Sequence, residues 1–402
     1  MVYKEFQDKK LSALGFGAMR LPVSDSIPGT PIDEEKTEEM VDFALRHGVN
    51  YFDTAYGYHD GTSEVVMGKV LGKYPRDSYY LATKFPGYDL SNMDKVDTIF
   101  EEQLGKCGME YFDFYLLHNI YEKNIDPYLD PKYGIMDYLL KQKENGRIRH
   151  LGFSAHGRYD TMKRFLEAYG DKMEFCQIQL NYLDWKLQDA KAKVELLNEY
   201  HIPIWVMEPL RGGKLAELSA ENEAKLHALR PEEAVPAWAF RFLQSIPGVT
   251  MVLSGMSNRD QLEKNIATFA EDRPLNEEEM TAILEAADSM LDVLPCTACR
   301  YCHMACPYGA PQYNAEKGHM TKCDGCYSRV AEGKQPICVE SCPLRALEFG
   351  PIEELRQKHG TLAAVAPLPR AHFTKPNIVI KPNANSRPTG DTTGYLANPE
   401  EV

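Results

Sequence analysis

The chain has 402 residues, 44% hydrophobic and 26% charged, a composition typical of a folded protein with one large domain and a smaller part. Its formal net charge of -14 argues against binding to a nucleic-acid backbone, and no Lys- or Arg-rich run offsets that charge. The first ten residues are too polar for a signal peptide, and no apolar run reaches the roughly 18 residues of a membrane span. These features predict a cytoplasmic protein with no nucleic-acid partner and no membrane insertion.

Apolar strand-like runs alternate with helical patterns over the first 290 residues. We predict strands at residues 14–19, 50–55, 79–85, 112–118, 148–155, 175–182, 202–208 and 250–255. A short segment at residues 3–12 is expected to form a hairpin that plugs the bottom of the barrel. Eight repeats of strand and helix in this length predict an α/β fold, a (β/α)8 TIM barrel. A doubly wound open sheet is the alternative, but it would need a third glycine after Gly15 and Gly17.

Four proton-active side chains are expected at the ends of successive strands, where parallel α/β proteins build their active sites. Asp53 ends the second strand, Tyr58 lies in the loop behind it, Lys84 ends the third strand and His118 ends the fourth. Each alone could be structural, as a turn cap, a solvated strand end or a core histidine. A tyrosine titrates near pH 10, so donating a proton at neutral pH requires a nearby cation, here Lys84. Asp53 would hold that ammonium, and His118 could hydrogen-bond a carbonyl group.

The segment FDTAYGYHDGTSE, followed by ATK and LLH, resembles the signature of the aldo-keto reductases over about residues 1–290. The resemblance implies hydride transfer from a nicotinamide cofactor, usually NADPH, to an aldehyde or ketone. It also implies roles for the four residues. Tyr58 would be the general acid, Lys84 the residue that lowers the pKa of Tyr58, Asp53 the support of Lys84, and His118 the orienting group.

The same resemblance implies contacts to the nicotinamide carboxamide. Ser154 in GFSAH, together with Gln179 and Asn181 in QIQLNY, matches the positions that hold this group in the family. Buried hydroxyl and amide groups there would fix which face of the ring meets the substrate. A hydrogen-bonded strand end is the structural alternative for all three.

After the eighth strand, SGMSNRDQLEKN resembles the family segment that binds the adenosine 2′-phosphate. Ser257 and Arg259 open a helix, and a hydroxyl and a guanidinium at a helix N-terminus suit a phosphate. The resemblance places Gln261 and Asn265 against the adenine. Lys264 departs from the family, which usually has an acidic residue there. This segment favours NADPH over NADH.

Cysteines are concentrated after residue 295, whereas Cys107 and Cys176 are expected to be small buried hydrophobes. Clustered thiols in a reducing compartment favour metal binding over disulfides. The clustered residues are Cys296, Cys299, Cys302 and Cys306, spaced CxxCxxCxxxCP, and Cys323, Cys326, Cys338 and Cys342, which end in CxxxCP. This spacing predicts two [4Fe-4S] clusters, with one cluster or zinc as alternatives. By ferredoxin logic Cys342 joins the first three cysteines, and Cys306 joins Cys323, Cys326 and Cys338.

The C-terminal part shows two resemblances. LPCTACRYC resembles the start of a ferredoxin-like domain that some aldo-keto reductases carry. From about Cys299 to Val402 the chain resembles instead the electron-transfer beta subunit of dimethyl sulfoxide reductase, of whose four cysteine groups only the last two are matched. In that family the two groups belong to different cluster pairs. The change from one resemblance to the other at about Cys299 indicates a chimera, which is either a gene fusion or a product of recombination or of sequence assembly.

We therefore predict three parts: a barrel at residues 1–290, a 4Fe-4S ferredoxin-like domain at residues 291–350, and a helix with an extended or disordered tail at residues 351–402. The predicted function is NADPH-dependent reduction of an aldehyde or ketone, coupled or adjacent to iron–sulfur electron transfer. The alternative is a non-catalytic iron–sulfur electron-transfer or docking subunit of a multi-subunit oxidoreductase. Expected partners are a small carbonyl substrate and a redox protein.

Overall fold

The computed structural model describes residues 1–24, 31–291, 310–314, 319–368, 370–391 and 393. Internal contacts divide the chain into two compact units, Met1–Pro295 and Cys296–Val402, and each is described by itself. The division into three parts at residues 290 and 350 stays a prediction. No helix in the described part of the chain is both long and apolar enough to cross a membrane.

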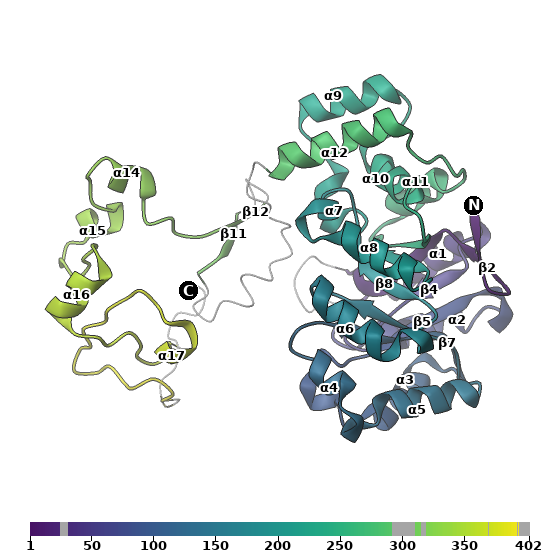
Figure 1. Cartoon of the computed structure of the whole chain (residues 1–402), viewed down its shortest axis with the longest axis horizontal. Helices are drawn as coiled ribbons and strands as arrows, with labels where there is room; N and C mark the ends of the chain where they lie inside the picture. The colour runs from purple at the N-terminus through teal and green to yellow at the C-terminus, as the bar shows by residue number, and fades with distance from the viewer. Residues whose placement is uncertain (25–30, 292–309, 315–318, 369, 392, 394–402) are drawn as a thin grey trace. The chain divides into compact units, whose positions relative to one another are not determined.

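Eight parallel strands close into a barrel in the first unit, which confirms the predicted (β/α)8 architecture (Figure 1). The strands pair in the order β10-β3-β4-β5-β6-β7-β8-β9, so an open doubly wound sheet is excluded. Their bounds are β3 (Leu14–Gly17), β4 (Tyr51–Asp53), β5 (Tyr80–Phe85), β6 (Phe112–Ile120), β7 (Ile148–Ala155), β8 (Cys176–Gln179), β9 (Ile204–Met207) and β10 (Val249–Ser254). Each strand overlaps one of the eight predicted runs.

Helices surround the strands of the first unit (Figure 1). They are α1 (Glu34–Arg46), α2 (Ser63–Leu71), α3 (Val96–Cys107), α4 (Ile125–Leu129), α5 (Ile135–Glu144), α6 (Tyr159–Tyr169), α7 (Asp184–Leu187), α8 (Ala190–Glu199), α9 (Ala220–Leu229), α10 (Val235–Gln244), α11 (Arg259–Thr268) and α12 (Glu277–Leu291). Short 3-10 turns are η1 (Ala18–Arg20), η2 (Arg76–Ser78), η3 (Leu90–Asn92), η4 (Pro131–Tyr133), η5 (Gly170–Lys172) and η6 (Arg211–Ala216).

Local sequence explains where these helices begin and which face they bury. Asp33 precedes α1, and its side chain accepts the backbone N–H of Lys36, which satisfies one of the unpaired donors of the first turn. In α6, Met162, Phe165 and Leu166 recur at helical spacing and are buried. This apolar face packs against the barrel, where the ring of Phe165 lies 4.6 Å from that of Phe153.

An N-terminal hairpin fills one end of the barrel, as predicted. It consists of β1 (Tyr3–Phe6) and β2 (Lys9–Ser12), which pair antiparallel. The ring of Phe6 lies 5.1 Å from that of Trp205 and 5.7 Å from that of Phe114, measured between centroids. These aromatic side chains form an inner apolar cluster, distinct from the larger core between strands and helices. This filling is mainly apolar, although the ring of His150 also packs against that of Phe6, with 5.1 Å between centroids.

The second unit has a small amount of regular structure. Its elements are β11 (Gln312–Asn314), β12 (His319–Thr321), α14 (Tyr327–Ala331), α15 (Ile337–Ser341), α16 (Ile352–His359) and α17 (Ala371–Thr374). The strands β11 and β12 pair antiparallel, and α16 coincides with the charged helix expected at the start of the tail. Within the tail, the backbone N–H of Ile380 donates to the carbonyl oxygen of Leu362 at 2.7 Å.

Two helical glycines give a matched test of the packing between α2 and α3. A Cβ atom on Gly68 would lie 2.6 Å from the Cα of Cys107, whereas one on Gly105 would meet nothing within 4 Å. We expect Gly68→Ala to lower the free energy of unfolding by about 1–3 kcal/mol, because the added methyl overpacks a backbone contact. Gly105→Ala should raise it by about 0.5–1 kcal/mol, because alanine favours the helix. Urea denaturation of both variants checks this, and equal shifts would contradict the close approach.

Candidate functional site

Three of the predicted proton-active residues meet at the carboxyl ends of β4 and β5. The ammonium Nζ of Lys84 lies 2.5 Å from Oδ1 of Asp53 and also donates to the carbonyl oxygen of Thr54 at 2.7 Å. Lys84 is fully buried, and Asp53 is 3% exposed. Strand register brings them together, because Asp53 pairs with Ala82 and Lys84 points to the same face two residues later.

Tyr58 completes the group from the loop between β4 and α2. Its hydroxyl lies 3.4 Å from Nζ of Lys84, which also sits 4.9 Å from the centre of the tyrosine ring. The loop turns sharply because His59, Asp60 and Gly61 all take positive φ angles of 50°, 54° and 86°. Glycine adopts that conformation without strain. The turn holds Tyr58 over the strand ends.

Burial raises the pKa of Tyr58 above its ordinary value, and the positive charge of Lys84 opposes that rise without overcoming it. The resemblance implied that Lys84 would lower this pKa. Lys84 acts in the expected direction, but the net shift is upward because the phenol is desolvated. Lys84 itself stays charged. Burial alone would lower its pKa, but Asp53 and Tyr58 together raise it above the usual value.

His118 joins the group from the end of β6. Its ring lies 6.1 Å from the ring of Tyr58 and 5.3 Å from that of Tyr88, both edge to face. Burial, helped by the positive charge of Lys84, holds the pKa of His118 well below its usual value, so the imidazole is neutral at neutral pH. Its Nδ1 is buried with no hydrogen-bond partner among the described residues. The four predicted residues thus converge on one place.

Ser154, Gln179 and Asn181 lie at the same end of the neighbouring strands. The hydroxyl of Ser154, in β7, accepts the backbone N–H of Asn119 at 2.7 Å. Gln179 ends β8, and Asn181 follows two residues later. The amide nitrogens of both donate to Oδ2 of Asp184, at 2.8 Å and 2.7 Å respectively.

Asp184 and Arg211 are buried charged residues that the sequence analysis missed. They are 0% and 4% exposed, and Oδ1 of Asp184 lies 3.2 Å from Nη2 of Arg211. Nε and Nη1 of Arg211 are buried without a hydrogen-bond partner in the described structure. The sequence held one signal for Arg211, namely the two glycines that follow it directly after β9. Gly212 and Gly213 take positive φ angles of 67° and 94°, so they form a turn beside this arginine.

The predicted phosphate segment forms the start of α11, after β10. Asn258 caps this helix by accepting the backbone N–H of Gln261 at 3.0 Å. The hydroxyl of Ser257 donates to the carbonyl oxygen of Arg20 at 3.1 Å. Arg259 pairs with Glu263 at 2.6 Å, and its guanidinium lies over the ring of Phe43 at 3.4 Å. The side chains predicted to hold a phosphate are therefore already engaged within the chain.

The two predicted adenine contacts differ in exposure. Asn265 is buried, and its amide nitrogen donates to the hydroxyl of Ser254 at 3.1 Å. Gln261 is exposed, and its side-chain oxygen accepts the backbone N–H of Ser257 at 2.9 Å. Lys264, the departure from the family pattern, forms a surface ion pair with Asp260 at 2.7 Å.

The cysteine array is only half described. Cys296, Cys299, Cys302 and Cys306 lie outside the described residues, so each predicted ligand set contains at least one cysteine that is not placed. Cys323, Cys326, Cys338 and Cys342 are described and are not in disulfides. Within the described ranges, no group of three or more His, Cys, Asp or Glu side chains could hold a metal ion.

Backbone donors around two of the described thiols suit a bound iron–sulfur cluster. The backbone N–H of Ala346 donates to Sγ of Cys342 at 3.3 Å, and that of Gly325 donates to Sγ of Cys323 at 3.4 Å. The Ala346 N–H, ahead of smaller effects, lowers the pKa of the Cys342 thiol. Hydrogen bonds to sulfur stabilise the thiolate form that ligates iron.

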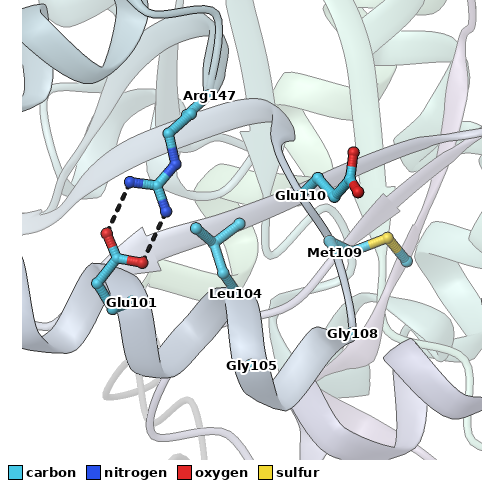
Figure 2. A pocket seen from close by; sticks show the side chains of 7 residues that line it. All are labelled: Glu101, Leu104, Gly105, Gly108, Met109, Glu110 and Arg147. Atoms are coloured by element: carbon cyan, nitrogen blue, oxygen red, sulfur yellow. Dashed lines mark hydrogen bonds and ion pairs between the residues drawn. The ribbon is translucent and has the colours of Figure 1, made fainter.

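A shallow hollow lies at the end of the barrel strands opposite to Asp53, Lys84 and His118. Figure 2 shows the seven residues that line it: Glu101, Leu104, Gly105, Gly108, Met109, Glu110 and Arg147. Arg147 pairs with Glu101 through two hydrogen bonds of 2.6 Å and 2.7 Å. Met109 and Glu110 precede β6 and Arg147 precedes β7, so the hollow is at the amino-terminal ends of these strands. It is separate from the group around Lys84.

Comparison with known families decides the class of the barrel. The family model described as "Aldo/keto reductase family" matches residues 13–288. The chain belongs to the aldo/keto reductase family. It is therefore an oxidoreductase, and the aldo-keto reductase AKR11C1 from Bacillus halodurans in its holo form has a similar structure. That likeness has a TM-score of 0.58 and 25% identity, and it covers 71% of this chain and 96% of the other.

Two curated relatives show the double character of the chain. L-galactose dehydrogenase from Arabidopsis thaliana is 28% identical over 307 residues, which is 70% of this chain and 93% of the relative. Probable anaerobic dimethyl sulfoxide reductase chain YnfG from Escherichia coli K12 is 98% identical over 107 residues, 27% of this chain and 52% of the relative. The chain thus spans about half the length of YnfG and of its close relatives. A model for a 4Fe-4S dicluster domain matches residues 264–352, which confirms the predicted iron–sulfur domain. The identity to YnfG confirms the resemblance to the dimethyl sulfoxide reductase beta subunit.

The neutral state of His118 can be measured directly. We expect its ring to remain neutral at about pH 5.5, where an ordinary histidine of pKa 6.5 is largely protonated. NMR titration of labelled histidines gives the result, with His118→Gln identifying the signal. Below about pH 6.5 the unfolded chain binds a proton that folded His118 does not, so this residue makes stability fall as the pH falls. A His118 signal that titrates near 6.5 would contradict the burial.

Proposed function

We propose that the barrel reduces an aldehyde or ketone with NADPH and that Tyr58 is the general acid. The observation that carries this proposal is the position of Lys84, whose ammonium lies between the carboxylate of Asp53 and the hydroxyl of Tyr58. The ring of His118 lies beside that of Tyr58 at the same end of the strands. Membership of the aldo/keto reductase family supports it. When bound, NADPH supplies a hydride to the carbonyl carbon.

The proposed roles follow from charge and burial. Tyr58 is protonated at neutral pH because burial raises its pKa, so it has a proton to give to the carbonyl oxygen. The phenolate left behind is stabilised by Lys84, whose ammonium is fixed by Asp53. Neutral His118 hydrogen-bonds the carbonyl group and orients it.

Residues around the site fit a nicotinamide dinucleotide. We assign the carboxamide end to Ser154, Gln179 and Asn181, which lie at the carboxyl ends of strands next to the catalytic group. The adenosine end would be held by Ser257 and Arg259 at the start of α11, with Gln261 and Asn265 against the adenine. Binding of a 2′-phosphate would let Arg259 exchange Glu263 for the phosphate, which favours NADPH over NADH.

The second unit is proposed to carry two [4Fe-4S] clusters, ligated by the eight cysteines from Cys296 to Cys342. The match to a dicluster domain and the N–H donors at Cys323 and Cys342 support this. Such clusters would relay single electrons to or from a redox protein. We place the protein in the cytoplasm, where thiols remain reduced.

A second candidate function is a non-catalytic iron–sulfur electron-transfer or docking subunit of a multi-subunit oxidoreductase. The 98% identity to part of a probable dimethyl sulfoxide reductase chain favours it. This alternative predicts cluster redox signals without any NADPH-dependent activity. The intact group of Asp53, Tyr58, Lys84 and His118 favours catalysis.

Tyr58→Phe tests the proposed acid. Carbonyl reduction should fall by roughly 10²–10⁴-fold, because a positioned general acid contributes about that factor. The dissociation constant for NADPH should hardly change. The measurement is steady-state turnover of a panel of small aldehydes and ketones, together with fluorescence titration of NADPH.

Tyr56→Phe is the matched control for this variant. Its hydroxyl bonds Glu102 on α3 at 3.0 Å, away from Lys84, so turnover should be preserved. Unchanged turnover in Tyr58→Phe would overturn the assignment of the acid. Absence of NADPH-dependent turnover in the wild-type chain, with cluster redox signals present, would favour the second candidate function.

Iron and acid-labile sulfide should each be present at about eight atoms per chain after anaerobic purification, because two cubane clusters each contain four of both. Cys338→Ser should lower both counts, whereas Cys176→Ser should leave them unchanged because that thiol is buried in the barrel. Four or fewer irons in the wild-type chain would show that the array does not assemble two clusters.

A further inference from the structure

A second histidine lies beside His118 at the carboxyl ends of the strands. His156 directly follows β7, and its ring lies 6.3 Å from that of His118, measured between centroids. The residue is exposed, and its side chain makes no hydrogen bond or ion pair with any residue that the structure describes. The roles proposed above for Tyr58, Lys84, Asp53 and His118 leave this imidazole unused.

The backbone holds His156 in this place. Its N–H and that of Gly157 both donate to the carbonyl oxygen of Ile120, at 3.0 Å and 2.9 Å respectively. A Cβ atom on Gly157 would lie 2.9 Å from the Cα of Tyr121, so the loops after β6 and β7 approach each other closely at this glycine. The loop after β7 is therefore tied to the end of β6, which keeps His156 next to His118.

The strand order places His156 on one side of His118 and an aromatic ring on the other. In the barrel β6 lies between β5 and β7. Tyr88 follows β5, and its ring meets that of His118 edge to face at 5.3 Å. A Cβ atom on Gly57 would lie 2.3 Å from the Tyr88 hydroxyl, so Tyr88 packs against the loop that carries Tyr58. We expect a substrate whose carbonyl group is held by Tyr58 and His118 to extend away from Tyr88, toward His156.

The imidazole of His156 is neutral at neutral pH. Although the residue is exposed, the protein around the ring displaces enough water to lower its pKa to about 4, and the positive charges of Lys193 and Lys84 act in the same direction. A neutral imidazole has one N–H donor and one acceptor nitrogen. It therefore suits a hydroxyl group, which both donates and accepts, better than a carboxylate, which only accepts.

We propose that His156 binds a hydroxyl group on the carbon next to the reacting carbonyl, so that the barrel prefers α-hydroxy aldehydes and ketones to simple ones. The inference rests on the proposed reductase function and names its substrate class. Oxygens on adjacent carbons are close enough for one to bond Tyr58 and His118 and the other His156, through hydrogen bonds of about 2.7–3.2 Å. The reaction adds a hydride from NADPH to the carbonyl carbon and the proton of Tyr58 to its oxygen, which gives a vicinal diol and NADP⁺.

Hydroxyacetone and butanone test this preference, because they differ only by a hydroxyl group in place of a methyl group. The two ketones also differ in intrinsic reactivity, so the readout is the change in the ratio of their kcat/KM values between wild type and variant. His156→Phe keeps an aromatic ring but removes both nitrogens, and it should lower this ratio by about tenfold, the effect of one hydrogen bond. The loss should fall on hydroxyacetone. His156→Gln, whose amide also donates and accepts, should keep part of the preference.

His227→Phe is the matched control, because His227 is an exposed histidine on α9 whose Nδ1 lies 3.2 Å from the carbonyl oxygen of Pro231. It should leave the ratio unchanged, and the dissociation constant for NADPH should be the same in His156→Phe as in wild type. An unchanged ratio in His156→Phe would show that His156 does not bind the hydroxyl group. Weaker NADPH binding with an equal loss for both ketones would assign His156 to the cofactor instead and overturn the inference.

These outcomes separate this inference from the proposed function. If wild-type protein reduces both ketones with NADPH but the ratio does not respond to His156, the substrate class alone is wrong. If wild-type protein reduces no carbonyl compound with NADPH, the proposed function fails and this inference fails with it.

Discussion

The buried ion pair between Lys84 and Asp53 is the constraint on which the site depends. Taking an ammonium and a carboxylate out of water costs several kcal/mol for each ion, and the contact of 2.5 Å, together with the Thr54 carbonyl oxygen, offsets that cost. Such a pair tolerates little displacement, because either charge left alone in the barrel would be strongly unfavourable. It therefore fixes Nζ of Lys84 beneath the hydroxyl of Tyr58, where a chemical role can be built on it.

The helices outside the barrel support this pair from behind. Gln103 of α3 donates to the carboxylate of Glu64 at 2.6 Å and to the carbonyl oxygen of Lys84 at 3.0 Å, and it accepts the hydroxyl of Tyr115 at 2.6 Å. Glu64 belongs to α2 and also accepts the hydroxyl of Thr83. Strand β5 is thus tied to both helices. The close approach of α2 and α3 at Gly68 is part of the same arrangement, since a wider separation would weaken these bonds.

The sequence predicted the parts of this design that follow from periodicity. Eight apolar runs located the strands, and the rule that active sites lie at strand ends brought together Asp53, Lys84 and His118. The burial of the Tyr58 hydroxyl could not be predicted from periodicity, because Tyr58 lies in a loop. The upward shift of its pKa was therefore missed. Asp184 and Arg211 were missed because they are 27 residues apart and meet only when β8 and β9 pair. All eight predicted cluster ligands stay predictions, and the four before residue 310 lie outside the described residues.

The raised pKa of Tyr58 also bears on the direction of the proposed reaction. Reduction uses the protonated phenol, which burial favours, whereas oxidation of an alcohol would need the phenolate as a base. Lys84 stabilises that phenolate but does not reverse the upward shift of the pKa of Tyr58. At neutral pH Tyr58 is therefore protonated, which is the state that reduction uses. Raising the pH toward the pKa of Tyr58 removes the acid and supplies the base. On this argument the same four residues serve both directions, and the protonation state of one buried hydroxyl affects how fast each direction starts at a given pH, while the reactants set the equilibrium.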